Sequence, residues 1–130
     1  MAKYKTIKVK KYSDVIEEFV VAEEKTIAPG MVVKLTANGE VEPGGSALLM
    51  VALEDELQGK GIDDAYVAGD PVQVWIPYRG DIFNGIGSGL TVGAFVEAGT
   101  DGKLVTHNAG VVVGQVVEVL ENNRVLIRVA

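Results

Sequence analysis

Cysteine is absent from this chain of 130 residues, and histidine and tryptophan each occur once. Without cysteine there is no disulfide framework and no thiolate metal site, so stability must come from packing, sheet hydrogen bonds or association. Aromatic residues make up only 6% of the chain, whereas there are 16 glycines. A hydrophobic fraction of 48% with that many glycines predicts a globular, turn-rich protein rather than a disordered one.

Long apolar runs are also missing, since none approaches the ~20 residues that a membrane helix needs. The lysine-rich N-terminus lacks the apolar segment of a signal peptide. We therefore expect a soluble, unsecreted protein with no membrane partner. Its length suits one domain with its own core.

Positive charge is scarce after the first eleven residues. Five of the twelve basic residues lie in that segment, and no acidic residue precedes Asp14. We divide the chain into a basic N-terminal arm, residues 1–14, and a single β-rich domain, residues 15–130. The rest of the chain after residue 11 has a net charge of −11, which argues against nucleic acid as the partner. We expect the arm to contact an acidic protein surface, with a solvated tail as the alternative; its lysines are Lys3, Lys5, Lys8, Lys10 and Lys11.

The patterning of apolar residues predicts an all-β fold. Between the turn at Gly69-Asp70-Pro71 and Pro77, Val72, Val74 and Ile76 alternate with Gln73 and Trp75, as in a half-buried strand. Asx-Gly and Asn-Asn pairs predict hairpins at 38–39, 101–102 and 122–123. Residues 13–24 are compatible with a helix or a strand, and their β-branched residues favour the strand.

An internal repeat appears when the chain is shifted by 63 positions. Gly30 then aligns with Gly93, the turn at 38–39 with that at 101–102, and 48–50 with 111–113, without a gap. Duplicated hairpins of this kind predict a small β-barrel or a β-sandwich-like domain, because closure removes exposed strand edges. The extended N-terminal arm completes the expected fold.

Trp75 points away from the other apolar residues of its strand if that strand is regular. One interpretation places it on the surface as a capsid or subunit contact, since tryptophan is enriched among the energetically dominant residues of interfaces. The other has a segment such as residues 81–93 cover it within the chain. The sequence leaves both open.

Candidate catalytic and metal-binding groups each have a plainer explanation. His107 lies in a loop without a nucleophile pattern, and the acidic runs at 54–56 and 63–64 lack the spacing of a calcium loop. The alternating glycines at 85, 87 and 89 have no lysine or helix after them, so we expect a flexible loop rather than a phosphate site. No catalytic residue, cofactor or metal is assigned.

The order of these segments resembles the capsid decoration, or cement, proteins of tailed bacteriophages. The residues that carry the resemblance are the run 54–66, the turn and strand at 69–77, Arg79-Gly80-Asp81, and the hairpin after Gly93 with 98–104. The resemblance spans roughly residue 15 to the C-terminus. It transfers no site residue, because such proteins have no catalytic motif.

What the resemblance implies is a structural protein, not an enzyme, that binds the outside of a viral capsid. It would be made in the host cytoplasm, contact the major capsid protein, often as a trimer, and stabilise the shell by bridging neighbouring subunits. A small ligand- or carbohydrate-binding β-domain is the alternative from another class, and a hydrolase using the acidic loop is a third.

Overall fold

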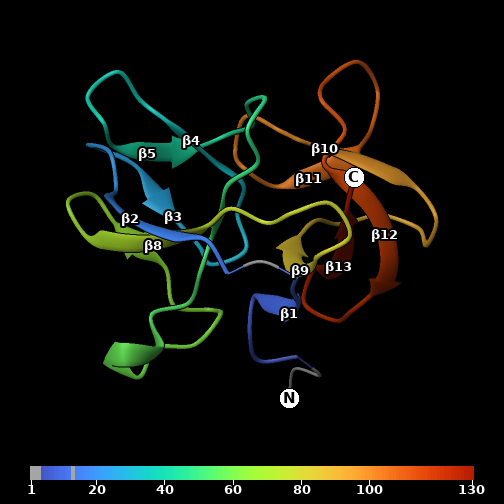
Figure 1. The fold of residues 1–130 in the computed structure, drawn as a ribbon, viewed down its shortest axis with the longest axis horizontal. Coiled ribbons are helices and arrows are strands. Elements are labelled where there is room, and N and C mark those ends of the chain that lie inside the picture. The colour runs from blue at the N-terminus through green and yellow to red at the C-terminus, as the bar shows by residue number, and fades with distance from the viewer. Residues whose placement is uncertain (1–3, 13) are drawn as a thin grey trace.

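The computed structural model describes residues 4–12 and 14–130, and its strands form antiparallel sheets (Figure 1). A 3-10 turn, η1, is the one helical element of these residues. The elements are β1 (Lys8–Lys10), β2 (Ile16–Val20), β3 (Thr26–Ile27), β4 (Val33–Leu35), β5 (Val41–Pro43), β6 (Val51–Ala52), η1 (Glu56–Gln58), β7 (Tyr66–Val67), β8 (Pro71–Trp75), β9 (Ile82–Ile86), β10 (Phe95–Ala98), β11 (Leu104–Thr106), β12 (Gly114–Val119) and β13 (Arg124–Val129).

The sequence repeat is also a repeat of topology. In the C-terminal half, β9, β13, β12, β10 and β11 lie side by side in a six-stranded sheet whose remaining strand is β1. The N-terminal half has the equivalent order, β2-β8-β6 followed by β4-β5. An isolated bridge between Val32, just before β4, and Val51 of β6 connects these two small sheets. Figure 1 shows the two halves on opposite sides of the view. The shift of 63 residues therefore superposes β4 on β10, β5 on β11 and β6 on β12.

Equivalent glycines of the two halves also have the same backbone conformation. Gly30 and Gly93 have φ values of +93° and +92°, and Gly39 and Gly102 have +79° and +76°. Positive φ is the conformation that favours glycine over residues with a side chain. The same turns therefore recur at the same places in both halves, as the alignment of the sequence predicted.

The predicted hairpins form, but the sheets do not close. The turn at 38–39 joins β4 to β5, and that at 122–123 joins β12 to β13, with Asn122 and Asn123 both at positive φ. None of the sheets is closed into a barrel, and the six-stranded sheet ends at β1 and β11. The all-β prediction is confirmed, and the arrangement is closer to a sandwich than to the predicted barrel.

Two hydrophobic clusters correspond to the two halves. One gathers Val21, Ile27, Val33, Val41 and other residues of the first half, including Val72 and Val74 of β8. The second gathers nine residues between Phe83 and Val129 together with six from the first half, among them Ile7 and Val32. Trp75 belongs to this second cluster, so β8 contributes side chains to a different core on each face.

The glycine run at 84–89 differs from the flexible loop that we expected. Residues 84–86 belong to β9, which pairs with both β1 and β13. A Cβ atom at Gly85 would lie 2.7 Å from Cδ1 of Leu104, so this glycine lets another strand pack against β9. The first part of the run is therefore strand, with close packing at Gly85 and Gly87, whereas Ser88 and Gly89 are exposed in the turn that follows.

Candidate docking site

The predicted arm is partly integrated into the domain. Ile7 is fully buried in the second core cluster, and β1 pairs with β9 through Lys8 opposite Phe83 and Lys10 opposite Ile82. Residues 7–10 thus complete a sheet of their own chain, because β1 pairs with the edge of β9 and the apolar side chain of Ile7 is buried there.

The arm lysines do not act as one group. Lys8 and Lys11 each contact the Asp14 carboxylate, at 2.7 Å and 2.9 Å, and these bonds hold the pKa of Asp14 below its ordinary value. Lys5 is exposed, Lys10 is exposed on β1, and Lys3 lies outside the described residues. Among the described arm lysines, Lys5 and Lys10 are therefore the two that form no ion pair.

Trp75 is not on the surface, since its side chain has 0% exposure. Its side chain does point away from Val72 and Val74, as the alternation predicted, but the opposite face of β8 is covered by the C-terminal half of the chain. The same cluster contains Phe83 and Leu90, which lie in the covering segment that the sequence suggested. The interpretation of Trp75 as a surface contact is therefore corrected to a core residue that joins the two halves.

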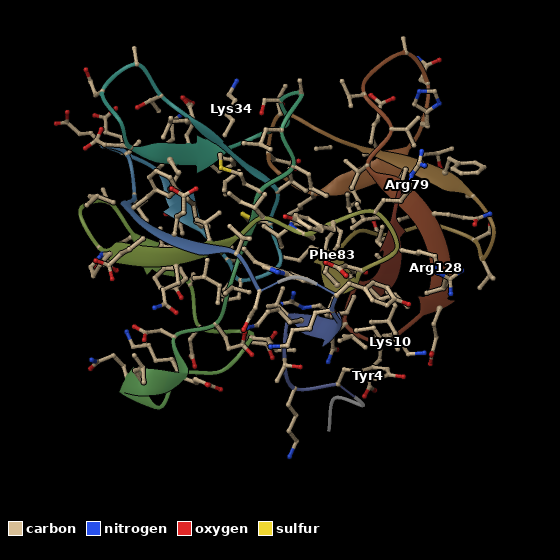
Figure 2. The ribbon with its side chains drawn as sticks, in the orientation of Figure 1. Tyr4, Lys10, Lys34, Arg79, Phe83 and Arg128 are labelled. Carbon is tan, nitrogen blue, oxygen red and sulfur yellow. The ribbon has the colours of Figure 1, made fainter. Side chains whose placement is uncertain are left out.

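Lys10 shares one face of the six-stranded sheet with Arg128, a basic residue distant from it in the sequence. Ile82 of β9 stands between Lys10 of β1 and Arg128 of β13 in the cross-strand register, so both basic side chains lie on the same face of the sheet. Figure 2 shows Arg79, Arg128 and Lys10 in the right half of the view, with Arg128 between the other two. We call the set Lys10, Tyr12, Tyr78, Arg79 and Arg128 the basic–aromatic face.

A buried carboxylate, that of Asp81, holds the backbone of two segments of this face. The Asp81 side chain has 0% exposure and accepts hydrogen bonds from the backbone N–H of Tyr12 at 2.6 Å and of Tyr78 at 2.8 Å. These bonds tie the segment after β1 to the turn before β9. A Cβ atom at Gly80 would lie 3.5 Å from the Tyr12 ring, so the ring lies over the turn. Arg79-Gly80-Asp81 thus forms a turn, with the Asp81 side chain pointing inward.

Exposure and charge make the basic–aromatic face suited to binding. Tyr12 is 83% exposed and Tyr78 is 57% exposed, and the three basic residues are exposed as well. Within residues 4–12 and 14–130, none of these three basic side chains forms an ion pair. Tyrosine and arginine are enriched where protein partners bind tightly. The face is therefore a cationic, aromatic surface on a protein whose net charge is −6.

The residues of the basic–aromatic face are far apart in the sequence. Lys10 and Tyr12 are close together, but Arg79 and Arg128 are distant from them and from each other. Only the pairing of β9 with both β1 and β13 brings them to one surface. The one indication of this face within a short stretch of sequence was that Tyr12 and Tyr78 are each adjacent to a basic residue.

A buried arginine links the two halves but contributes to no surface. Arg124 is 6% exposed, and its guanidinium donates hydrogen bonds to the carbonyl oxygens of Pro29 at 2.8 Å and Ile62 at 2.5 Å. Burial lowers its pKa, and the Asp63 carboxylate at 3.6 Å opposes that effect. This side chain fastens β13 to two loops of the first half.

Hollows on the surface are modest. The one lined by both copies of the repeated loop, at 45–49 and 110–113, has a volume of about 310 Å³ and is lined mainly by glycine and aliphatic side chains. It lacks the converging polar groups of a typical ligand site. Among the described residues there is no cluster of three metal-ligating side chains and no helix long and apolar enough to span a membrane.

No protein-family model matches this chain, and its sequence matches no curated protein. A solved structure with a similar fold is the head fiber gp8.5 N base of bacteriophage phi29. The TM-score is 0.58 at 16% sequence identity, and the likeness covers 89% of this chain and 95% of that chain. At this identity the likeness establishes a shared fold.

Proposed function

We propose that this chain is a non-catalytic structural protein of a tailed-phage head. The observation that carries the proposal is the likeness of fold to the head fiber base, which extends over nearly the whole of both chains. The order of sequence segments that resembles capsid decoration proteins supports the same class independently. The protein would be made in the host cytoplasm and act at the outer surface of the virion.

The basic–aromatic face is the docking surface in this proposal. Its cationic and aromatic side chains would contact an acidic surface of the major capsid protein. Because Asp81 holds Tyr12 and Tyr78 in place before binding, little side-chain or loop ordering is needed on docking. Lys5 lies in the segment that leads into β1 and would contribute further positive charge.

Bridging of neighbouring subunits supplies the mechanism. A protein that binds the assembled shell, but not separated subunits, stabilises the shell by RT ln(1 + [L]/Kd) per site, about 2.7 kcal/mol when its free concentration is a hundred times Kd. No turnover is required. We propose a trimer as the attached form, since three copies would contact several capsid subunits at once and gain avidity.

Purified protein mixed with phage heads that lack it provides the test, with electron microscopy to locate bound density and a sedimentation assay to measure occupancy. Lys10→Glu and Arg128→Glu should each weaken binding roughly tenfold or more at low salt, because each places like charges together at the interface. Lys60→Glu makes the same change of charge at an exposed residue beside η1 and should leave binding intact.

Failure of the unmodified protein to bind any head would refute the proposed function. Normal binding by both face variants would refute the docking surface alone. Removal of residues 1–5 tests the combined contribution of Lys3 and Lys5, because the truncated chain keeps Ile7 and β1. The ligand-binding alternative would gain support only from a small molecule or sugar that occupies the hollow between the repeated loops.

A further inference from the structure

The chain contains three Asx-Gly pairs, and the structure places them in different surroundings. The pair at 38–39 forms the turn between β4 and β5, and the pair at 101–102 is its counterpart between β10 and β11. The pair at 84–85 lies within β9. An asparagine before glycine can lose its side-chain amide, because no Cβ of the next residue hinders the approach of the backbone nitrogen. Any difference in reactivity between the two Asn-Gly pairs is therefore set mainly by the structure around them.

The turn at 38–39 is exposed and weakly held. Asn38 and Gly39 are both exposed, and a Cβ atom added to Gly39 would meet nothing within 4 Å. The Gly39 N–H donates a hydrogen bond to the Thr36 carbonyl oxygen at 3.0 Å, and the Asn38 N–H donates to the Thr36 hydroxyl oxygen at 3.3 Å. Because these bonds lie at the tip of a hairpin, local opening frees the Gly39 nitrogen without unfolding the sheets.

The other two pairs are enclosed by neighbouring segments. Asn84 has 0% exposure, and its strand is paired on both sides, with β1 and with β13. A Cβ atom at Gly85 would lie 2.7 Å from Cδ1 of Leu104, and one at Gly102 would lie 2.6 Å from the Val32 carbonyl oxygen. Neighbouring atoms therefore block the backbone rotation that a reaction at either pair requires, because a packed interior leaves no space for it.

We propose that Asn38-Gly39 is a site of spontaneous deamidation in the folded protein. The Gly39 nitrogen attacks Cγ of Asn38, so that an N–Cγ bond forms, the Cγ–Nδ2 bond breaks, and ammonia leaves with the proton that the Gly39 nitrogen gives up. Water then opens the succinimide ring. Hydrolysis of the new N–Cγ bond leaves aspartate, and hydrolysis of the original peptide bond leaves isoaspartate, in which Cγ carries the main chain. The reaction consumes one water, releases one ammonia and needs no oxidant or reductant.

The two products change the turn differently. Either product adds a negative charge next to Glu40, on a chain whose net charge is already −6. Aspartate makes the turn Asp-Gly, the pair that already forms the equivalent turn at 101–102. Isoaspartate adds one carbon to the main chain between β4 and β5, which loosens the register of this hairpin because loop length helps to fix register. This site is separate from the basic–aromatic face and does not depend on the function proposed above.

The test keeps the full chain folded in a warm, mildly alkaline buffer and follows it by tryptic digestion and mass spectrometry, with a sample digested at time zero as the blank. Asn38 falls in fragment 35–60, whereas Asn84 and Asp101 both fall in fragment 80–103. We expect conversion at Asn38 to be roughly tenfold or more faster than at Asn84, because Asn84 reacts only from opened states. An isoaspartyl methyltransferase should label fragment 35–60 and not 80–103. In urea that unfolds the chain, the two asparagines should react at similar rates.

Two variants separate the effect of the folded turn from that of the local sequence. Thr36→Val removes the hydroxyl oxygen that accepts the N–H groups of Asn38 and Glu40. Conversion at Asn38 should then become roughly twofold to tenfold faster in the folded chain and stay unchanged in urea. Gly39→Ala should suppress the reaction, because its Cβ hinders the nitrogen. Gly93→Ala, the same change at another open glycine of positive φ, should not.

Three results would each overturn the proposal. Conversion at Asn38 that occurs in urea but not in the folded chain would show that the hairpin protects its turn. Conversion of Asn84 as fast as that of Asn38 in the folded chain would show that burial and strand pairing do not control the reaction. More isoaspartate at Asp101 than at residue 38 would place the reactive turn in the second half instead.

Discussion

Replacement of Trp75 by alanine should lower the free energy of unfolding by about 3–5 kcal/mol, because it empties the junction between the two halves of the chain. The side chain is fully buried, in a cluster to which both halves of the chain contribute side chains. An aromatic side chain buries roughly 150–250 Å², which is worth about 4–6 kcal/mol at about 25 cal/mol per Å². Residual burial in the unfolded chain reduces that value to about 3–5 kcal/mol.

Urea unfolding followed by circular dichroism measures this loss. A domain of this size has a stability of about 5–15 kcal/mol and a urea slope of about 1–3 kcal/mol per molar, so the midpoint should fall by roughly 2 M. Trp75→Phe keeps most of the volume and should cost clearly less. The oligomeric state, measured at the same concentration by sedimentation, should not change while the variant remains folded.

Val74→Ala provides the matched comparison on the other face of β8. Val74 is also fully buried, but it packs in the cluster of the first half. Amide hydrogen exchange should therefore lose protection mainly in β9 and β13 for Trp75→Ala and mainly in β4 and β5 for Val74→Ala. A loss of less than about 1 kcal/mol for Trp75→Ala, or loss of assembly with unchanged monomer stability, would show that this reasoning is wrong.

Two further predictions concern the repeated turns and the loop after β11. Gly30→Ala should destabilise the chain by about 1–3 kcal/mol more than Gly93→Ala, as measured by urea unfolding. Both glycines have nearly the same positive φ, but only at Gly30 would a Cβ atom lie 2.6 Å from the Asn84 carbonyl oxygen and against Arg124. Equal losses of stability in the two variants would contradict this reasoning. The backbone N–H groups of Asn108 and Gly110 hold the pKa of Glu97 below its ordinary value. The ionised Glu97 carboxylate therefore stabilises the fold above the unfolded-state pKa, and this stabilisation is lost as the pH falls through the lower folded-state pKa. An NMR titration should show that midpoint below the ordinary glutamate value, and Glu97→Gln should remove this part of the pH dependence of stability; a midpoint at or above the ordinary value would exclude the bonded loop.

Much of the local structure could be predicted because its causes lie within a few residues. The Asn-Gly and Asn-Asn pairs tolerate positive φ and so form hairpin turns at 38–39 and 122–123. The alternation in 72–76 places Val74 and Trp75 on opposite faces of β8. The repeat at 63 residues was visible in the sequence because the same turn and strand signals recur at the same spacing.

The candidate docking site could be predicted only in part. Basic charge near the N-terminus was evident, but Asp14 pairs with Lys8 and Lys11, whereas Lys10 lies with Arg128 through β9. Asp81 is buried, and its hydrogen bond from the backbone N–H of Tyr12 joins residues 69 positions apart. Such contacts leave no trace in a local pattern.

The sequence by itself determined an all-β chain, the positions of its tight turns and its internal duplication, since each follows from the conformational preferences of neighbouring residues. The tertiary structure decided what covers Trp75, which strand receives β1, and which distant side chains meet on one surface. These outcomes depend on how the two halves pack and on which edge each strand joins, and such choices are settled by the burial and hydrogen bonding of the whole chain.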